Sequence, residues 1–428
     1  MQNKQRGAHL KVAALFDNFG PYHLARLTAA SAVMEILAVE FGGSSGEYAW
    51  ERSEAAQALQ RVTLFPASSS RQVSTLDFEA RLNEVLDGFR PEAVAIPGWS
   101  GRGAFLAMEW CVKNRVPAIV MSESTSYDET RSGWREWIKR RYVGLCSAAL
   151  VGGRPHREYM QQLGMAAEQI FLGYDAVDNR YFAEQAEKIR NQKSEIRNHR
   201  QLPDNYFLAS ARFIEKKNLS RLIEAYALYR KHSAVRNPQS AIWSLVLLGD
   251  GELRPTLNAR LLALHEKEMG ERSRQTRFST SSLLESVHLP GFKQYPELPI
   301  YYALAGAFIH ASTTEQWGLV VNEAMASGLP VLVSNRCGCA PDLVEESVNG
   351  FTFDPTNVEQ LARLMFELST KVSQLSTFGA ASQRIISNWG MDRFAQGLKE
   401  AAECAIHFGS PRKSLLSCLV LWVLIKLK

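Results

Sequence analysis

The sequence predicts an α/β fold made of two Rossmann-like domains, each with a parallel sheet covered by helices. The chain has 428 residues, which is enough for about three domains of average size or for two large ones. Short apolar runs alternate along nearly all of it with stretches of helical spacing, the pattern of βαβ units. A charged stretch, Ala183–Gln201, interrupts this pattern near the middle and indicates a domain boundary.

The predicted strands are short apolar runs, as expected where a parallel sheet is buried on both faces. Helical spacing is clearest in Leu219–Lys231 and Leu253–Met269. The predicted strands are Val12–Phe16, Ala93–Ile96, Ala118–Met121 and Ala148–Val151 in the first half, and Phe207–Ala211, Leu245–Leu248, Ala307–Ala311 and Val331–Val333 in the second.

These elements give an N-terminal domain over residues 1–200 and a C-terminal domain over residues 203–390. We expect residues 391–408 to form an amphipathic helix that packs back towards the N-terminal domain. Residues 411–428 are an apolar tail, and its run Leu415–Ile425 is almost entirely apolar. As a helix this run is about 16 Å long, about half of the hydrocarbon core of a bilayer. It therefore either lies in a membrane interface or docks on the body of the protein.

Composition excludes several classes of protein. The net charge of +5, from 49 Lys and Arg against 44 Asp and Glu, is too small a surplus to indicate nucleic-acid binding. The six cysteines form no C-x-x-C and no His/Cys grouping, which argues against a disulfide scaffold and a structural zinc site. The first apolar run is too short for a signal peptide. We expect a cytoplasmic protein, with peripheral membrane contact through the tail left open.

The segment over residues 307–334 carries the strongest chemical pattern. A loop, Ser312–Trp317, joins the strand to a helix, Gly318–Ser327, whose start lies at the strand's carboxyl end and favours an anion. Glu315 lies just outside the helix and Glu323 inside it. A ligand with a diphosphate between two sugars would satisfy both carboxylates, since these accept hydrogen bonds from hydroxyls. Equally, Glu315 could favour the helix dipole while Glu323 is simply solvated.

The E-x7-E element in TTEQWGLVVNEAMASGLPVLVS resembles the donor-site signature of the family-4 retaining glycosyltransferases of the GT-B fold (glycosyl transferases group 1). ASARFIEKKNLSRLIEAY, LVLLGDGELRP and VHLPGFKQYPELPIYYALA precede it in the family's order, so the similarity covers residues 205–400. The resemblance implies two Rossmann-like domains that face each other across a cleft. It also implies an enzyme of hexosyltransferase type.

By this resemblance the enzyme moves a sugar from a nucleotide-diphosphate sugar to an acceptor hydroxyl with retention of configuration. A UDP-sugar is favoured as the donor, and the acceptor is a carbohydrate or is lipid-linked, as in glycan, glycolipid or polysaccharide biosynthesis. No D-x-D element is present, so we expect neither a metal nor another cofactor. The alternatives are a nucleotide-sugar epimerase, a sugar phosphorylase or a non-catalytic sugar-nucleotide-binding protein.

The resemblance also assigns roles to residues of the second half. Arg212 and Lys217 match the basic pair that neutralises the diphosphate, although lysines at a helix start are also ordinary surface charges. Glu315 faces the transferred sugar, and Glu323 holds the ribose hydroxyls. The remaining residues expected to bind the donor are Gly20, Gly249, Gly251, Gln316, Trp317, Gly318 and Leu319.

The first half is more divergent. Gly20-Pro21 begins a helix that carries His23 and Arg26, which we expect to bind the acceptor, although a histidine in a first helical turn is often structural. Glu123 ends a strand at a point where similar proteins carry a histidine, so it either assists catalysis or binds acceptor hydroxyls. Trp134 and Trp137 share a helix face among basic residues, which fits a membrane, an anionic acceptor or simple packing on the sheet.

Overall fold

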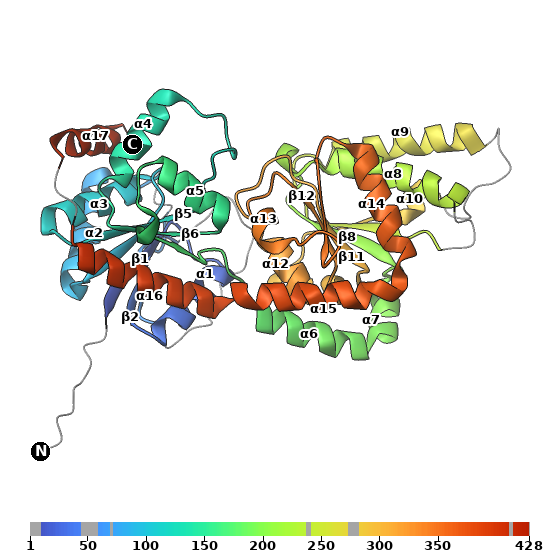
Figure 1. The fold of residues 1–428 in the computed structure, drawn as a ribbon, viewed down its shortest axis with the longest axis horizontal. Helices are drawn as coiled ribbons and strands as arrows, with labels where there is room; N and C mark the ends of the chain where they lie inside the picture. Colours follow the sequence, from blue (N-terminus) through green and yellow to red (C-terminus); the bar gives the residue numbers. More distant parts are fainter. Residues whose placement is uncertain are drawn as a thin grey trace, which may run out of the picture. The chain divides into compact units, whose positions relative to one another are not determined.

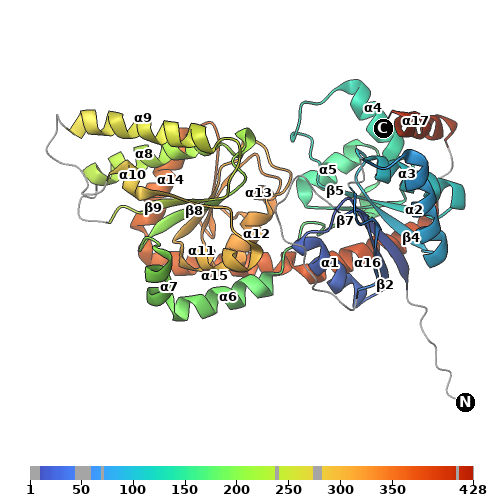
Figure 2. The same ribbon diagram turned by 180° about the vertical axis from the view of Figure 1, so that it is seen from behind.

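The computed structural model describes residues 10–43, 59–68, 72–236, 241–272, 282–410 and 414–427. The chain forms two compact units (Figures 1 and 2). Unit 1 holds Met1–Val177 and Trp389–Lys428, and unit 2 holds Asp178–Asn388. The chain therefore crosses from unit 1 to unit 2 and back, and each unit has its own sheet.

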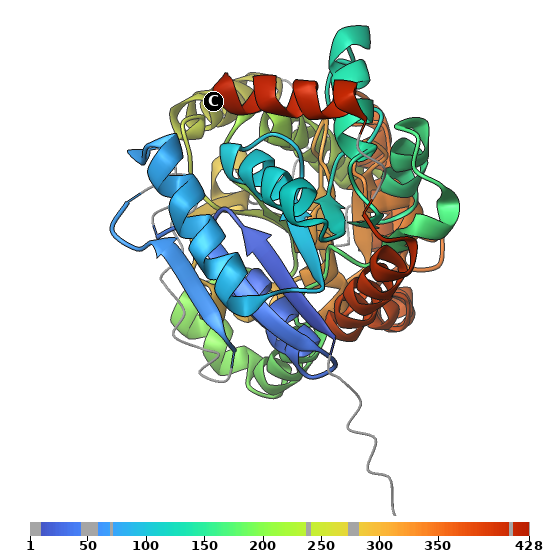
Figure 3. The same cartoon turned by 90° about the vertical axis from the view of Figure 1, so that its left-hand side faces the viewer.

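Unit 1 contains a parallel sheet in the order β3-β2-β1-β4-β5-β6-β7. Its strand residues alternate between two hydrophobic clusters: Ala13 and Leu15 enter one, and Val12 and Ala14 enter the other. Helices therefore cover both faces, as Figure 3 shows with unit 1 towards the viewer. The strands are β1 (Lys11–Phe16), β2 (Glu35–Gly42), β3 (Arg61–Phe65), β4 (Ala93–Pro97), β5 (Ala118–Ser122), β6 (Ala148–Val151) and β7 (Ile170–Leu172). The helices are α1 (Pro21–Ser31), α2 (Thr75–Phe89), α3 (Arg102–Asn114), α4 (Gly133–Val143), α5 (Arg154–Gln162), α16 (Met391–Phe408) and α17 (Leu415–Lys426).

Unit 2 contains a parallel sheet in the order β10-β9-β8-β11-β12-β13. The strands are β8 (Tyr206–Ser210), β9 (Ser244–Leu248), β10 (Val287–Gly291), β11 (Ala307–His310), β12 (Val331–Ser334) and β13 (Gly350–Phe353). The longer helices are α6 (Asn179–Asn191), α7 (Lys193–Arg200), α8 (Leu219–Arg236), α9 (Arg254–Arg272), α11 (Leu298–Leu304), α12 (Leu319–Ala326), α14 (Val358–Thr370) and α15 (Leu375–Ile386). The two Rossmann-like parallel sheets confirm the predicted fold class.

Both sheets reverse their strand order at the centre. In unit 1 the chain adds β2 and β3 on one side of β1 and then places β4 on the other side, and in unit 2 β8 and β11 have the same relation. Parallel neighbours end at the same edge, and the loops that follow them diverge. Ligands of open α/β sheets bind in the crevice at this reversal, outside the carboxyl ends of the strands.

The boundary between the units lies at Val177, before the one predicted from residues 183–201. That charged stretch is not a linker, because α6 packs against α11 and α12 within unit 2. Phe182 is fully buried and contacts the rings of Tyr295 and Tyr302. Arg197 donates from Nη2 to the carbonyl of Leu304 at 3.0 Å, at the end of α11. An aromatic side chain thus attaches α6 to unit 2 and an arginine attaches α7, and both helices have few aliphatic residues.

The last two helices belong to unit 1. α16 packs against α1, β6 and β7, and α17 packs against α3 and α4. None of the helices in the described part of the chain is long and apolar enough to cross a bilayer.

Candidate functional site

Two loops of unit 2 meet at the carboxyl edge of its sheet, where β8 lies next to β11. The loop after β8 carries Arg212 and ends in a short turn over Glu215–Lys217. The Thr313 amide, in the loop after β11, donates to the carbonyl of Lys216 at 2.9 Å. The side-chain amide of Asn218 donates to the carbonyl of Ala311 at 3.0 Å. The loop after β8 is therefore held directly against the loop after β11.

Glu315 is the centre of a charged cluster in these loops. Its carboxylate pairs with Lys217 Nζ. Lys216 Nζ lies 3.7 Å from Oε1, and His310 Nε2 lies 3.4 Å from Oε2. The Ser312 hydroxyl donates to Oε2 at 3.2 Å. Only 11% of the Glu315 side chain and 14% of the Lys217 side chain are exposed, so these charges interact in a largely desolvated environment.

This environment fixes the protonation states of the cluster. Burial acts to raise the pKa of Glu315, but the hydrogen bond from His310 and the charges of Lys217 and Lys216 outweigh it and hold that pKa well below its usual range. Burial lowers the pKa of His310, and the bond to Glu315 only partly opposes this. At neutral pH the cluster thus holds an ionised carboxylate and a neutral imidazole.

A glycine fixes the position of the strand end that carries Arg212. Gly249 has φ +126°, and a Cβ atom there would lie 1.8 Å from the carbonyl oxygen of Ala211. The loop after β9 can therefore lie close to the segment after β8, where the Phe213 amide donates to the carbonyl of Asp250 at 2.8 Å. Gly251 makes a similar close approach to Phe213. Both glycines shape the Arg212 loop, and Arg212 itself is exposed.

The start of α12 also requires a glycine. Gly318 precedes the helix with φ +108°, and a Cβ atom there would lie 3.3 Å from His310 Nε2. The residue thus allows α12 to begin directly beside the Glu315 cluster, where its first backbone N–H groups and positive dipole end favour an anion. Of the neighbouring residues predicted to bind the donor, Gln316 is exposed and Leu319 is half-buried.

Two predicted donor residues lie deeper than expected. Glu323 was expected to line an open cleft, but the residue is 1% exposed, and Tyr302 Oη donates to its Oε2 at 2.7 Å. Trp317 is 2% exposed, and its Nε1–H donates to Asn322 Oδ1 at 2.9 Å. The reason is the position of α12, which is covered on both sides by the sheet and by α6 and α15. Both side chains stabilise the interior beneath the cluster.

The candidate acceptor residues of unit 1 are occupied within their own domain. His23 Nδ1 accepts from the Gly20 amide at 3.0 Å, which caps α1. Burial and the nearby Arg26 lower the pKa of His23 to about 3, so the ring is neutral. Arg26 is 1% exposed. Its Nε donates to the carbonyl of Ala176 at 2.8 Å, and its guanidinium lies 5.3 Å from the centre of the Tyr174 ring. Arg26 thus makes these contacts within unit 1, and a role in acceptor binding stays a prediction.

Glu123 follows β5 and is half-buried. Its charge affects the pKa of Asp175, a fully buried residue that follows β7. Burial raises the pKa of Asp175 well above its usual range, the charge of Glu123 raises it further, and Arg26 only partly opposes them. The carboxyl edge of unit 1 therefore keeps a protonated acid beside a second carboxyl group.

The residues missed from the sequence are Lys216, His310 and Ser312. His310 ends a buried strand, where a polar side chain is a usable signal.

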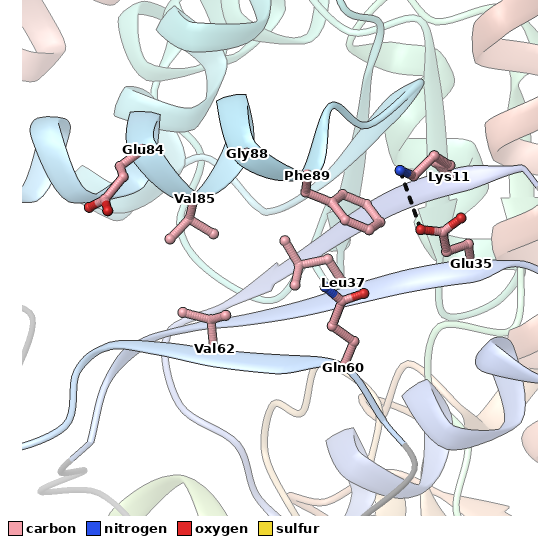
Figure 4. A pocket seen from close by; sticks show the side chains of 9 residues that line it. All are labelled: Lys11, Glu35, Leu37, Gln60, Val62, Glu84, Val85, Gly88 and Phe89. Atoms are coloured by element: carbon pink, nitrogen blue, oxygen red, sulfur yellow. Dashed lines mark ion pairs between the residues drawn. The ribbon is translucent and has the colours of Figure 1, made fainter.

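Within the described residues no group of three or more His, Cys, Asp or Glu side chains is arranged to hold a metal. A surface hollow at the amino ends of β1 and β2, beside the Lys11–Glu35 ion pair of 3.3 Å, contains none of the predicted site residues (Figure 4).

Comparison with known proteins finds sequence similarity mainly over unit 2. Residues 191–383 match the family model of the glycosyl transferases group 1. The chain is 27% identical over 199 residues to alpha-monoglucosyldiacylglycerol synthase of Acholeplasma laidlawii, covering 46% of this chain and 42% of that protein. It is 29% identical over 168 residues to the amylovoran biosynthesis glycosyltransferase AmsK of Erwinia amylovora, covering 38% and 35%. The matched segments thus span less than half of these relatives.

The fold is shared over almost the whole chain. The crystal structure of Anabaena HepE in complex with UDP superposes with a TM-score of 0.64, at 18% identity, over 91% of this chain and 99% of the other. The structural match shows the GT-B fold, and the sequence similarity to the group 1 glycosyl transferases lies in unit 2.

Proposed function

We propose that the protein transfers a sugar from a nucleotide-diphosphate sugar, preferably a UDP-sugar, to a hydroxyl of a carbohydrate or lipid-linked acceptor, with retention of configuration. The group 1 family match supports the use of a nucleotide sugar. The UDP bound to HepE fits the choice of nucleotide. Retention rests on the resemblance carried by the E-x7-E element.

The observation that carries the proposal is the cluster of Lys217, Lys216 and His310 around Glu315 at the reversal of the unit 2 sheet. Breaking the bond between the anomeric carbon and the diphosphate leaves negative charge on the leaving group. Fixed cations in a poorly solvated site stabilise that charge more strongly than water does. In the proposal Lys217 and Arg212 pair with the diphosphate, beside the start of α12.

Glu315 has the complementary task. A carboxylate that stays ionised accepts hydrogen bonds from sugar hydroxyls and orients the donor. In the proposal the incoming donor separates Glu315 from Lys217. The lysine then pairs with the phosphate, and the carboxylate accepts hydrogen bonds from the sugar. The acceptor oxygen then bonds to the anomeric carbon as the bond to the diphosphate breaks, and the acceptor proton passes to the leaving phosphate.

The test is a donor screen with a matched lysine control. UDP-, GDP- and ADP-sugars are compared for thermal stabilisation of the protein and for release of the nucleotide diphosphate with and without acceptor sugars. Lys217→Ala is expected to lower transfer about 100-fold or more. Lys371→Ala removes another lysine of unit 2, paired with Glu367 at 2.6 Å, and is expected to leave transfer unchanged.

The screen also separates the alternatives. Release that depends on an acceptor supports transfer. Conversion of the nucleotide sugar without an acceptor would indicate an epimerase, and binding without any turnover would indicate a sugar-nucleotide-binding protein. Wild-type transfer by Lys217→Ala would refute the role of the cluster.

A further inference from the structure

The helix α17 is apolar around its whole circumference, but only one face of it is covered. Leu421 and Ile425 are buried in the same hydrophobic cluster as Tyr142 and Val143 of α4. The opposite side is left in solvent: Leu419 is 57% exposed and Trp422 is 54% exposed. The other exposed apolar residues of the helix are Leu415, Leu416 and Val423, and the exposed Leu427 follows its last residue.

This apolar face is held in a fixed place. Packing against α3 and α4 anchors the helix, and the Ser414 hydroxyl accepts from the Ser417 amide to cap its start. Just before it, the Ser147 hydroxyl donates to the carbonyl of Gly409 at 2.8 Å. A grouped set of exposed apolar side chains on a fixed element marks an interaction surface rather than a disordered end.

The neighbouring helix α4 adds aromatic and basic groups, and the two helices lie side by side (Figures 1 and 3). Trp134 and Trp137 are 64% and 43% exposed. The guanidinium of Arg135 lies 5.5 Å from the Trp134 ring centre, and that of Arg141 lies 5.2 Å from the Trp137 ring centre. Arg140 is also exposed.

The charge of this pair of helices is positive. The one acid of α4, Glu136, accepts from Tyr159 Oη at 2.8 Å and from Lys139 Nζ at 3.2 Å. No acidic residue occurs in α17, which ends with the exposed Lys426. Apolar groups flanked by tryptophan and arginine match the boundary between acyl chains and anionic headgroups.

We infer that α17 and α4 form a docking surface for a bilayer that contains anionic phospholipid. The 12 residues of α17 extend about 18 Å, well short of the roughly 30 Å hydrocarbon core, so the helix lies in the plane of the interface. A second copy of the chain fits less well, because a symmetric contact would bring the basic α4 helices together. The surface lies in unit 1 and does not depend on the proposed transfer in unit 2.

The experiment is flotation of the full chain with vesicles of phosphatidylcholine and phosphatidylglycerol. Wild-type protein is expected to float with the mixed vesicles and to be released in part by high salt. Leu419→Gln/Trp422→Gln is expected to weaken vesicle binding about tenfold or more, since both side chains would enter the apolar boundary. The matched control, Leu76→Gln/Val372→Gln, changes two exposed apolar residues elsewhere and is expected to bind as wild type.

A second variant tests the charge. Arg135→Gln/Arg140→Gln is expected to weaken binding to the mixed vesicles about fivefold per charge and to have little effect on the weaker binding to pure phosphatidylcholine. Wild-type protein that stays unbound at low salt would overturn the proposal, as would equal binding by Leu419→Gln/Trp422→Gln. A dimer by light scattering that this variant converts to monomer would assign the surface to a second copy instead.

Discussion

The carboxyl edges of the two sheets use their charged residues in opposite ways. In unit 2, Lys217 and Glu315 pair with each other in two loops at the carboxyl edge of the sheet. In unit 1, Arg26 and His23 bond to the backbone of their own unit. The two sheets share the strand-order reversal, so the fold does not explain this difference. In unit 1 the charged side chains bond to the backbone of their own unit. In unit 2 they lie in loops where a ligand could replace one of the partners.

The difference teaches where a residue's effect should be sought. A charge already satisfied by its own domain contributes to stability, and its loss leaves a buried group without its partner. A charge in a loop cluster at the carboxyl edge of a sheet is also placed to meet a ligand, so its loss should appear in the chemistry. Each prediction below sets one unit against the other.

The largest effect is expected at Glu315. Glu315→Gln keeps the size of the side chain and removes the charge, so it should lower the transfer rate about 100-fold or more while the protein stays folded. The measurements are acceptor-dependent release of nucleotide diphosphate and the melting temperature. A variant with unchanged turnover would show that the cluster is structural, like the charges of unit 1.

Arg26→Met should act mainly on stability. The substitution leaves the carbonyl of Ala176 without its donor and removes a buried guanidinium that packs on the Tyr174 ring, so the free energy of unfolding of unit 1 should fall by about 1–3 kcal/mol. Arg180→Met is the control, because Arg180 is 88% exposed and pairs with Glu184 at the surface, and surface pairs contribute about 1 kcal/mol or less. Both are measured by denaturant unfolding, and equal losses in the two variants would contradict the buried role of Arg26.

Gly249 and Gly20 were both expected to contact the donor, and the structure predicts different results for them. Gly249→Ala would place Cβ against the Ala211 carbonyl at a positive φ, so unit 2 should lose about 2–4 kcal/mol and the Arg212 loop should shift. In Gly20→Ala the nearest atom is His23 Nδ1 at 3.6 Å, so a change within about 0.5 kcal/mol is expected. Thermal melting of the two variants provides the comparison, and similar losses would mean that the β9 loop adapts.

The sequence predicted the central strands better than the rest of the sheets. β1, β4, β5 and β8 are continuous apolar runs because both faces are covered. The strand β2 was missed since it carries Glu35 and Glu40, and the latter accepts from the amide of Phe19 at 2.6 Å. The edge strands β3, β7, β10 and β13 were also missed, because an edge strand is short and need not be apolar on both faces.

The candidate site shows the same limit. Glu315 stood out in the strand–loop–helix pattern of residues 307–334, whereas the basic pair Arg212 and Lys217 came only from the resemblance to the glycosyltransferase family. Burial could not be read: helical spacing did not reveal that α12 is covered on both sides, which hides Glu323 and Trp317. His310 was missed because a lone histidine at the end of a strand also fits the interior of a domain.

The smallest expected effect concerns pH, and its sign differs between the units. The pKa of Glu315 is held below its usual range, so its pairing adds stability above the unfolded value of about 4.3, and this is lost as the pH falls towards the folded value. The loss in free energy of unfolding caused by Glu315→Gln should therefore be largest near neutral pH and become smaller as the pH falls. Asp175 behaves in the opposite way, because its pKa is raised.

Folded Asp175 holds its proton while the unfolded chain releases it above about pH 3.9, so wild-type stability falls as the pH rises. Asn resembles the protonated acid in shape and charge. Asp175→Asn should thus match wild type at about pH 3.5 and exceed it by about 1 kcal/mol or more at about pH 8, with denaturant unfolding at both values as the measurement. If Asp175 were instead an ionised partner of Arg26, the variant would be less stable at both pH values. The carboxyl edges of both sheets would then hold an ionised carboxylate.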